Sequence, residues 1–136
     1  MSTALSLYRG IGRIATPLLR SHFNRRAERG KEDPARLGER FGHAGRARPD
    51  GQLLWMHAAS VGEALSALPL IEAIGAEHTL MTTGTVTSAR LVAARAPRII
   101  HQFAPMDTPQ AVAGFLEHWR PNLALWMESE IWPCLL

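Results

Sequence analysis

The sequence contains one cysteine, Cys134, and its six histidines are scattered along the chain. A lone cysteine cannot close an intramolecular disulfide, which fits a reducing compartment. Its neighbours Pro133 and Leu135 supply neither a base nor a positive charge that would activate a thiolate. No His-x-x-x-His pair or His/Cys pair has the spacing of metal ligands. We therefore predict no disulfide, no catalytic thiol, no metal site and no cofactor.

Several nucleotide and membrane signatures are also missing from the sequence. It has no Gly-x-x-x-x-Gly-Lys loop and no Gly-x-Gly-x-x-Gly fingerprint, which excludes the common ATPase and dehydrogenase designs. No apolar run approaches the roughly 18 residues of a membrane-spanning helix, and no cleavage site follows an apolar core as in a secretory signal. No segment resembles a nucleic-acid module with aromatic platforms or a recognition helix, so we do not expect nucleic acid as a partner.

Acidic residues are absent before Glu28, whereas five arginines precede it. Residues 1–50 carry 11 Arg and Lys against 5 Asp and Glu, while residues 51–136 carry 4 against 7. The net charge of +3 is therefore the sum of a basic N-terminal segment, residues 1–50, and an acidic segment, residues 51–136. A basic arm suits a nucleic acid, an anionic membrane or a phosphorylated substrate. The five arginines are Arg9, Arg13, Arg20, Arg25 and Arg26.

Residues 5–20 predict an amphipathic helix, with Arg9, Arg13 and Arg20 opposite an apolar face. The arginines interrupt the apolar residues too often for a membrane span, so one interpretation is a helix that lies among lipid headgroups. The alternative is packing against its own domain, the more common use of such a face. Pro17 is expected to kink the helix or to end its first part. The apolar face consists of Leu7, Tyr8, Ile11, Ile14, Ala15, Leu18 and Leu19.

The remaining residues divide into two parts. Gly and Pro interrupt a charged stretch over residues 27–50, which indicates a connector with one or two helical turns after the N-cap Asp33 and Pro34. From residue 51, apolar strands and helices alternate, which predicts a parallel sheet joined by right-handed crossovers. The expected strands are 53–57, 79–83, 99–103 and 123–127, and the expected helices are 62–74, 87–94 and 109–119.

Polar residues follow each expected strand, and parallel strands would bring them to one edge of the sheet. Ser60 and Glu63 follow the first strand, and Pro105 and Asp107 follow the third. Open α/β sheets bind ligands in the crevice outside this edge. Glu63 opens a helix, so it is either a general base held by rigid elements or an acidic first-turn residue that opposes the helix dipole.

The loop after the second strand carries several hydroxyl groups. Thr83, Thr85 and Ser88 lead into a helix and suit hydrogen bonds to a phosphate or a sugar. Arg90 has the length and charge to reach an acceptor phosphate or carboxylate, and the alternative for it is a solvated helix residue.

Glu128 and Glu130 follow the fourth strand as an acidic pair. Residues two apart share a face only where the chain stays extended, so which of the two faces the crevice is open. For Glu130, an acid-rich helix N-terminus is the alternative.

Five sequence blocks occur in an order that is typical of one enzyme family. Together they resemble the N-terminal half of the Kdo transferases (3-deoxy-D-manno-octulosonic acid transferases) of Gram-negative lipopolysaccharide synthesis. Each block alone is a weak signal, whereas five in order are specific. The family more often has Thr-Pro-Thr where this chain has Thr85-Val86-Thr87. The blocks are His57-Ala58-Ala59-Ser60-Val61-Gly62-Glu63, Pro69-Leu70-Ile71, Thr82-Thr83-Gly84-Thr85, Ala104-Pro105-Met106-Asp107 and Met127-Glu128-Ser129-Glu130-Ile131-Trp132-Pro133.

The resemblance implies a Rossmann-like α/β domain, the first of the two that face each other across a cleft in GT-B glycosyltransferases. The sequence stops in an apolar run, so we expect a truncated domain that lacks its nucleotide-sugar partner. The expected organisation is a membrane-associating helix over residues 1–26, a connector over 27–50 and an incomplete acceptor-binding domain over 51–136. We expect the fragment alone to be inactive.

By the same resemblance, the full enzyme would transfer Kdo from CMP-Kdo to a lipid A precursor, with inversion and without a metal, at the cytoplasmic face of the inner membrane. Glu63 would be the general base, and Glu128 would orient the acceptor or the base. The alternatives are another GT-B glycosyltransferase and a non-catalytic fragment that binds acceptor or membrane. The expected substrate-binding residues are Ser60, Gly62, Thr83, Thr85, Ser88, Arg90 and Glu130.

Overall fold

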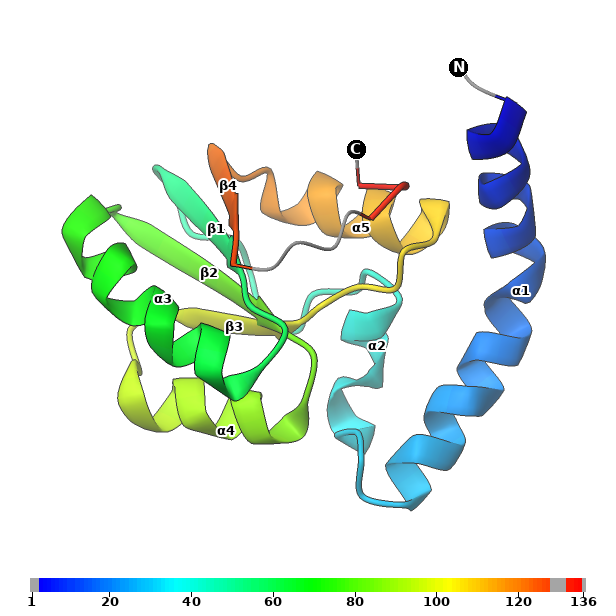
Figure 1. Cartoon of the computed structure of the whole chain (residues 1–136), viewed down its shortest axis with the longest axis horizontal. Helices are drawn as coiled ribbons and strands as arrows, with labels where there is room; N and C mark the ends of the chain where they lie inside the picture. Colours follow the sequence, from blue (N-terminus) through cyan, green and yellow to red (C-terminus); the bar gives the residue numbers. More distant parts are fainter. Residues whose placement is uncertain (1–2, 128–131, 136) are drawn as a thin grey trace.

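The computed structural model describes residues 3–127 and 132–135. Among these residues, four parallel strands form one sheet: β1 (Leu53–His57), β2 (His78–Thr83), β3 (Ile100–Phe103) and β4 (Leu123–Trp126), in the order β3-β2-β1-β4. The helices α3 (Val61–Ile74) and α4 (Val86–Arg95) cover one face, and α5 (Pro109–Trp119) covers the other (Figure 1). This arrangement follows from right-handed crossovers and confirms the predicted α/β class and Rossmann-like sheet.

The predicted strands and helices of residues 51–127 are all present, and their ends differ from the structure by no more than one residue. The reason is that a strand buried on both faces of a parallel sheet has an almost continuous apolar sequence. In β1, all five residues from Leu53 to His57 are buried.

The core has two halves because alternate side chains of a strand point to opposite faces. Leu54 and Met56 of β1 pack with α3 and α4, and Leu53 and Trp55 pack with α5. The ring of Trp55 lies 4.6 Å from that of Phe115. Burying these side chains on both faces holds the sheet rigid, and with it the ends of the strands.

Each helix that follows a strand begins at a hydroxyl N-cap. The side chains of Ser60, Thr85 and Thr108 accept hydrogen bonds from backbone N–H groups in the first turns of α3, α4 and α5. Such caps are worth about 1 kcal/mol each. They fix three helix N-termini, and their positive dipole ends, at the carboxyl edge of the sheet.

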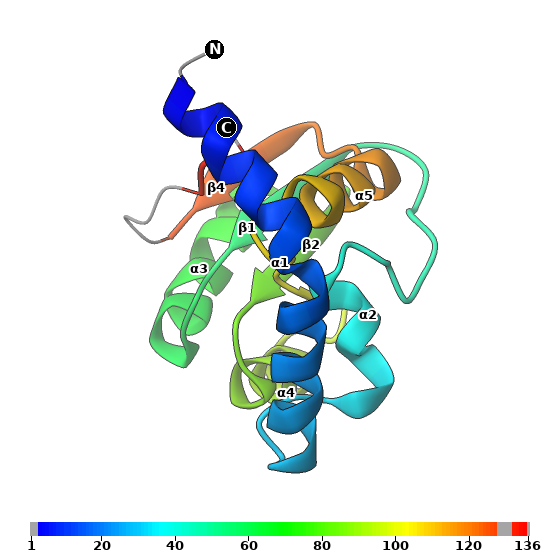
Figure 2. The ribbon, with the colours of Figure 1, turned by 90° about the vertical axis from the view of Figure 1, so that its right-hand side faces the viewer.

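The predicted N-terminal helix is present as α1 (Thr3–Glu28), a single helix of 26 residues that continues through Pro17. Of the two effects expected of Pro17, an end of the helix is therefore wrong, and a kink stays a prediction. No residue of α1 is buried. Gly12 faces α5, since a Cβ there would lie 3.3 Å from Pro109, and Figure 2 shows α1 running along this side of the molecule.

Four large side chains of the apolar face of α1 are mostly exposed, whereas Tyr8 of the same face donates a hydrogen bond to Asp107 at 2.8 Å. The exposed fractions are 66% for Leu7, 58% for Ile11, 81% for Ile14 and 75% for Leu18. Within the described part of the chain, no helix is both long enough and apolar enough to cross a membrane.

Residues 27–50 contain the 3-10 helix η1 (Pro34–Arg36) and the short helix α2 (Leu37–Arg40). The predicted N-cap is confirmed, because the Asp33 side chain accepts a hydrogen bond from Ala35 N. In Figure 1, α2 lies between α1 and the sheet. After α2 the chain passes tightly under α5: Gly42 has a φ of +86°, and a Cβ there would lie 2.2 Å from the carbonyl oxygen of Ala111. The division of the chain at residues 26 and 50 stays a prediction.

Candidate active site

The loops that follow β1, β2 and β3 meet at one edge of the sheet. Ala104 N donates a hydrogen bond to Thr83 O at 2.9 Å, which joins the loops after β3 and β2. A Cβ on Gly84 would lie 3.2 Å from Ala59 O, so the loops after β2 and β1 also touch. This edge is the one at which the sequence predicted the functional residues to converge.

The order of the strands creates a switch point beside β1. From β1 the chain moves outward through β2 and β3, and it then returns to pair β4 with the other side of β1. His57 and Trp126 are partners in this pairing, and Met127 N donates to His57 O at 2.9 Å. Open α/β sheets bind ligands at such a switch point. Glu63 lies beside this switch point, in the helix that follows β1. The predicted acidic pair, Glu128 and Glu130, lies outside the described residues.

Glu63 lies in the first turn of α3 and forms a capping box with Ser60. Its Oε2 accepts hydrogen bonds from Ala59 N at 2.7 Å and from Ser60 N at 3.3 Å, while Glu63 N donates to Ser60 Oγ at 3.3 Å. Within the described residues, Glu63 accepts these bonds through Oε2 alone, which leaves Oε1 for a ligand. Glu63 thus has the alternative role of an acidic residue that caps the first turn of a helix, and a catalytic role stays a prediction.

Ser60 and Gly62 are both exposed at the start of α3. A Cβ on Gly62 would meet only Ser60 Oγ, at 4.0 Å. The fold itself therefore accepts a side chain at this position. The predicted reason for Gly62, a close approach of the backbone to a sugar, stays a prediction.

Thr83 and Ser88 are fully buried and hydrogen-bonded within the domain. Thr83 Oγ1 lies 2.8 Å from Nε2 of His101, and Ser88 Oγ bonds to the hydroxyl of Thr85. Thr85 is exposed and caps α4. Of these three hydroxyls, only that of Thr85 belongs to an exposed residue, and substrate binding by all three stays a prediction.

Arg90 is exposed on α4 and borders a pocket of about 570 Å³ together with Arg36. Glu32 and Asp33 line the same pocket, which also reaches Phe103 at the end of β3. Two guanidinium groups beside the carboxyl edge suit a phosphate or carboxylate group. The predicted anion contact of Arg90 is therefore sterically possible and stays a prediction.

A buried ionic cluster that was not predicted from the sequence lies at this edge. Arg40 donates to Glu32 Oε2 through Nε and Nη2, at 3.1 and 2.9 Å, and to Gly84 O at 2.6 Å. Glu32 and Arg40 are 3% and 6% exposed. Burial lowers the pKa of Arg40, and the charge of Glu32 opposes that shift. The cluster ties residues 32–40 to the loop after β2.

A second cluster covers the free edge of β3. Glu39 Oε2 accepts from Phe103 N at 2.7 Å, and Arg36 donates to His101 O at 3.0 Å. Arg36 and Glu39 also pair with each other at 2.8 Å. These side chains satisfy backbone groups that an edge strand leaves open. The repeated glycines among charges, Gly38, Gly42 and Gly45, are the one sequence signal that marks this segment as closely packed.

His101 is neutral in this environment. Arg36 Nη2 donates to Nδ1 at 3.0 Å, so the proton of the ring is on Nε2, which donates to Thr83. Burial, followed by the charges of Arg36 and Arg40, lowers the pKa of His101 to about 3. In the unfolded chain His101 binds a proton when the pH is below 6.5, its ordinary pKa, and folding removes that proton.

We expect acidification to weaken the fold through His101. The pKa of His101 is lower in the folded protein than in the unfolded chain. The neutral ring therefore contributes its full stability above about pH 6.5, and this contribution is lost as the pH drops toward 3. Between pH 7 and pH 5 the loss should be of order 1–2 kcal/mol. His101→Gln, which keeps one acceptor and one donor, should remove this slope in urea unfolding measured at both pH values. An equal slope in both proteins would contradict it.

His57 is buried on the α5 face of the sheet, so it does not lie on the α3 face beside Glu63. Its Nδ1 is 2.8 Å from Thr82 Oγ1, which also accepts from Trp55 Nε1. The His57 ring packs against the rings of Trp126 and Trp132, with centroids 5.4 and 4.8 Å apart. His57 thus packs against Trp132, which follows the undescribed residues 128–131 in the sequence.

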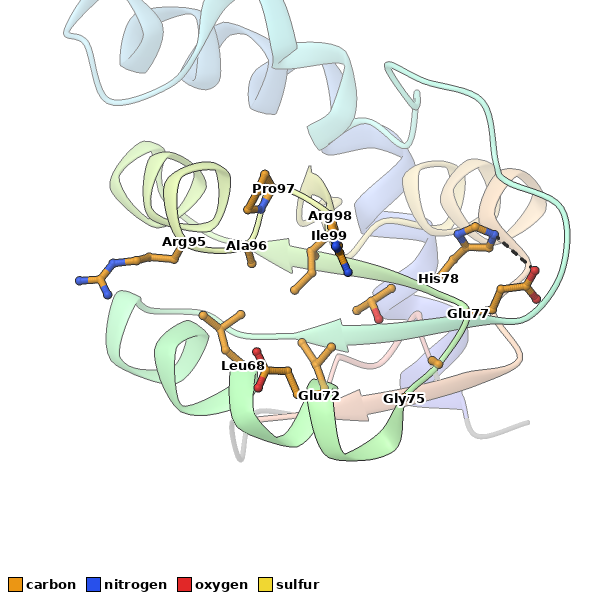
Figure 3. Close-up of a pocket in the computed structure, with 13 residues that line it drawn as sticks. Leu68, Glu72, Gly75, Glu77, His78, Arg95, Ala96, Pro97, Arg98 and Ile99 are labelled. Carbon is orange, nitrogen blue, oxygen red and sulfur yellow. Dashed lines mark ion pairs between the residues drawn. The ribbon is translucent and has the colours of Figure 1, made fainter.

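The opposite edge of the sheet holds a different pocket of about 520 Å³. It lies between the C-terminal ends of α3 and α4, and at its rim Nε2 of His78 lies 3.8 Å from Oε1 of Glu77 (Figure 3). The length of the strands separates this pocket from the loops after β1, β2 and β3, which meet at the carboxyl edge of the sheet. Within the part of the chain that the structure describes, no three His, Cys, Asp or Glu residues are grouped to hold a metal ion.

Comparison with known proteins decides the family. A model of the 3-deoxy-D-manno-octulosonic-acid transferase (kdotransferase) family matches residues 35–136. The chain belongs to the Kdo transferase family. The sequence blocks that carried the resemblance all lie within the matched residues.

Named Kdo transferases from distant organisms resemble this chain. The probable mitochondrial 3-deoxy-D-manno-octulosonic acid transferase of Arabidopsis thaliana is 43% identical over 135 residues, which cover 96% of this chain and 30% of that protein. The enzyme of Rickettsia felis is 44% identical over 89 residues (62% and 19%), and that of Haemophilus influenzae 36% over 107 residues (74% and 25%). The chain thus spans less than a third of these relatives. No solved structure matches it significantly.

Proposed function

We propose that this chain is the acceptor-binding domain of a Kdo transferase with two Rossmann-like domains. The full enzyme transfers Kdo from CMP-Kdo to a lipid A precursor in lipopolysaccharide synthesis, and residues 1–136 alone are inactive because the nucleotide-binding domain is separate. One observation carries the proposal: in a chain of this family, Glu63 opens the helix that follows β1, beside the switch point between β1 and β4.

In the proposed reaction, Glu63 removes the proton of the acceptor hydroxyl through its Oε1 atom. The acceptor oxygen then attacks the anomeric carbon of Kdo from the face opposite CMP, which leaves with the electrons of the broken bond. A single base is sufficient, because CMP needs no protonation of the kind that a sugar leaving group requires. The transfer inverts the anomeric centre and uses no metal.

The capping box gives Glu63 a suitable position for this role. Two backbone N–H groups hold Oε2, at 2.7 and 3.3 Å, so that the carboxylate is fixed before the acceptor arrives. A fixed base contributes more than a mobile one, because its orientation is already restricted. The same bonds that make Glu63 a cap therefore support its use as a base.

The exposed apolar face of α1 supports the proposed location at the cytoplasmic face of the inner membrane. Leu7, Ile11, Ile14 and Leu18 are more than half exposed, although α1 packs against α5 through Gly12. A row of large apolar side chains on a basic helix suits the interface of an anionic bilayer. The packing alternative holds at Gly12, and the exposed apolar side chains support membrane association.

We expect Ile14→Glu/Leu18→Glu to weaken binding of the full-length protein to anionic vesicles by at least about tenfold, because two apolar side chains no longer enter the lipid. Flotation with vesicles measures it. Leu70→Glu/Ile74→Glu on α3, at side chains that are 42% and 40% exposed, is the matched control and should bind normally. Point variants are preferable to deletion, because α1 also contacts the domain. Equal flotation of both variants would contradict membrane binding by this face.

Restoration of Kdo on lipid A tests the proposed function in a cell. The full-length protein is expressed in a Gram-negative strain depleted of its own Kdo transferase, and the lipid A fraction is analysed by mass spectrometry. We expect Kdo-bearing lipid A to return. Its absence in a strain that produces the folded protein would contradict the proposal.

A further inference from the structure

The loops that follow β2 and β3 are joined by one buried residue, Arg40. Its guanidinium group donates to Gly84 O at 2.6 Å and to Ala104 O at 3.3 Å. Its backbone adds another bond, because Met106 N donates to Arg40 O at 2.7 Å. Arg40 belongs to α2, which lies between α1 and the sheet (Figure 1). An element outside the sheet therefore fixes the loops after β2 and β3 at the carboxyl edge.

Arg40 itself has little freedom to move. Its Nε and Nη2 atoms donate to Glu32 Oε2, and its guanidinium group lies over the rings of Phe23 and Phe103, 5.6 and 4.8 Å from their centroids. A planar guanidinium group can hold a carboxylate and several carbonyl groups at once, whereas an ammonium group on a flexible chain acts as a point charge. The position of the loop that Arg40 holds is therefore set by a rigid group.

This loop touches the residue that holds the carboxylate of Glu63. Gly84 packs closely against Ala59, since a Cβ on Gly84 would lie 3.2 Å from Ala59 O. The N–H of Ala59 donates the shorter of the two hydrogen bonds to Glu63 Oε2, at 2.7 Å. A continuous path of contacts thus leads from the guanidinium group of Arg40 to the carboxylate of Glu63.

We propose that Arg40 is a positioning residue for the base Glu63: through Gly84 it fixes Ala59, whose N–H orients the carboxylate. The inference rests on the proposed function. A general base must lie within hydrogen-bond reach of the proton that it removes, and a misplacement of about 1 Å can cost about 10²-fold in rate. Loosening of the contact at Gly84 should therefore lower kcat and leave the KM for CMP-Kdo unchanged.

The first test is Arg40→Lys, which keeps a positive charge beside Glu32 and removes the planar group that reaches both loops. In steady-state Kdo transfer by the full-length enzyme in detergent micelles, kcat should fall by about 5- to 20-fold, with the KM for CMP-Kdo unchanged. Arg48→Lys is the matched control, because Arg48 also donates to backbone carbonyls, those of Trp119 at 2.6 Å and Gly51 at 3.1 Å, near the amino ends of β1 and β4. Its kcat should stay within about twofold of the unmodified enzyme.

Gly84→Ala tests the same path without a change in the ionic cluster. Gly84 does not have a positive φ, so its backbone conformation accepts alanine, but the added methyl group would press on Ala59 O. We expect kcat to fall by about 3- to 10-fold. Gly114→Ala on α5 is the control with similar crowding, since a Cβ there would lie 3.1 Å from Gly42 O, and it should leave kcat within about twofold. If Arg40→Lys does not fold, Gly84→Ala decides the question.

A double variant separates positioning of the base from a merely structural role. Glu63→Gln lacks the base and keeps the capping box, so Arg40 has no base left to position in this background. The double variant Arg40→Lys/Glu63→Gln should therefore be no slower than Glu63→Gln alone. If Arg40→Lys lowers kcat by the same factor in both backgrounds, Arg40 does not act through Glu63, and the inference is overturned.

Hydrogen exchange distinguishes this inference from the function on which it rests. Exchange of the Ala59 N–H should be at least about threefold faster in Arg40→Lys and Gly84→Ala than in the two control variants. Unchanged exchange in both variants, or a kcat within about twofold of the unmodified enzyme in both, would overturn the inference alone. Absence of transfer by the unmodified enzyme would overturn the proposed function and this inference together.

Discussion

Glu63→Gln is expected to lower kcat of the full-length enzyme by roughly 10²–10⁴-fold, the range for loss of a positioned general base. The fold should be retained, because glutamine also completes a capping box with a serine N-cap. The amide oxygen can accept the bonds that Ala59 N and Ser60 N now donate to Oε2. The substitution therefore separates the two roles of Glu63, since it removes the base and keeps the cap.

The measurement is kcat at saturating CMP-Kdo and acceptor, combined with thermal unfolding. Glu72→Gln is the matched control: it makes the same change on the same helix, at an exposed position near its other end. It should leave kcat unchanged. Near-normal turnover of Glu63→Gln would mean that Glu63 is only a cap, and the base would then be sought at Glu128 or Glu130.

Glu32→Gln is expected to lower the free energy of unfolding by about 3–5 kcal/mol, the typical effect of removing one partner of a buried ion pair. The substitution leaves the guanidinium of Arg40, which is 6% exposed, without its nearest counter-charge. It also releases Arg26 of α1, whose Nη2 lies 2.9 Å from Glu32 Oε1. The effect should therefore include loosening of the C-terminal end of α1.

Urea unfolding of the full-length protein measures this loss, and hydrogen exchange locates it. Glu117→Gln, the same change at an exposed position on α5, should alter the stability by less than about 0.5 kcal/mol. We expect faster exchange in α1 and in the loop after β2, where Arg40 donates to Gly84 O. A loss below about 1 kcal/mol would show that the cluster does not anchor the arm.

The sheet and its helices could be predicted because their signals are local. The apolar run that begins at Leu53 is typical of a strand buried on both faces, and the alternation of apolar runs with helical periods predicts α3 to within one residue of its start. The position of Glu63 follows from the same two elements. Its capping box is also readable in the Ser60-x-x-Glu63 spacing. The two roles predicted for Glu63, a general base or a charge opposite the dipole, did not make use of that spacing.

The ionic clusters could not be predicted because their partners are distant in the sequence. Arg36 binds His101, 65 positions away, and Glu39 binds the N–H of Phe103. A charged stretch with glycines has the composition of a solvated connector, and nothing local identifies its partners. Similarly, periodicity shows that α1 has an apolar face and does not show which way that face points.

Transfer of Kdo to lipid by the purified full-length protein tests the central claim most directly. The protein is incubated with CMP-Kdo and a lipid A precursor in micelles, with and without EDTA, and the lipid is analysed by mass spectrometry. We predict that the precursor gains the mass of Kdo, that CMP is released in equal amount, and that EDTA has no effect. An unmodified precursor, or modification only when another nucleotide sugar replaces CMP-Kdo, would contradict the account.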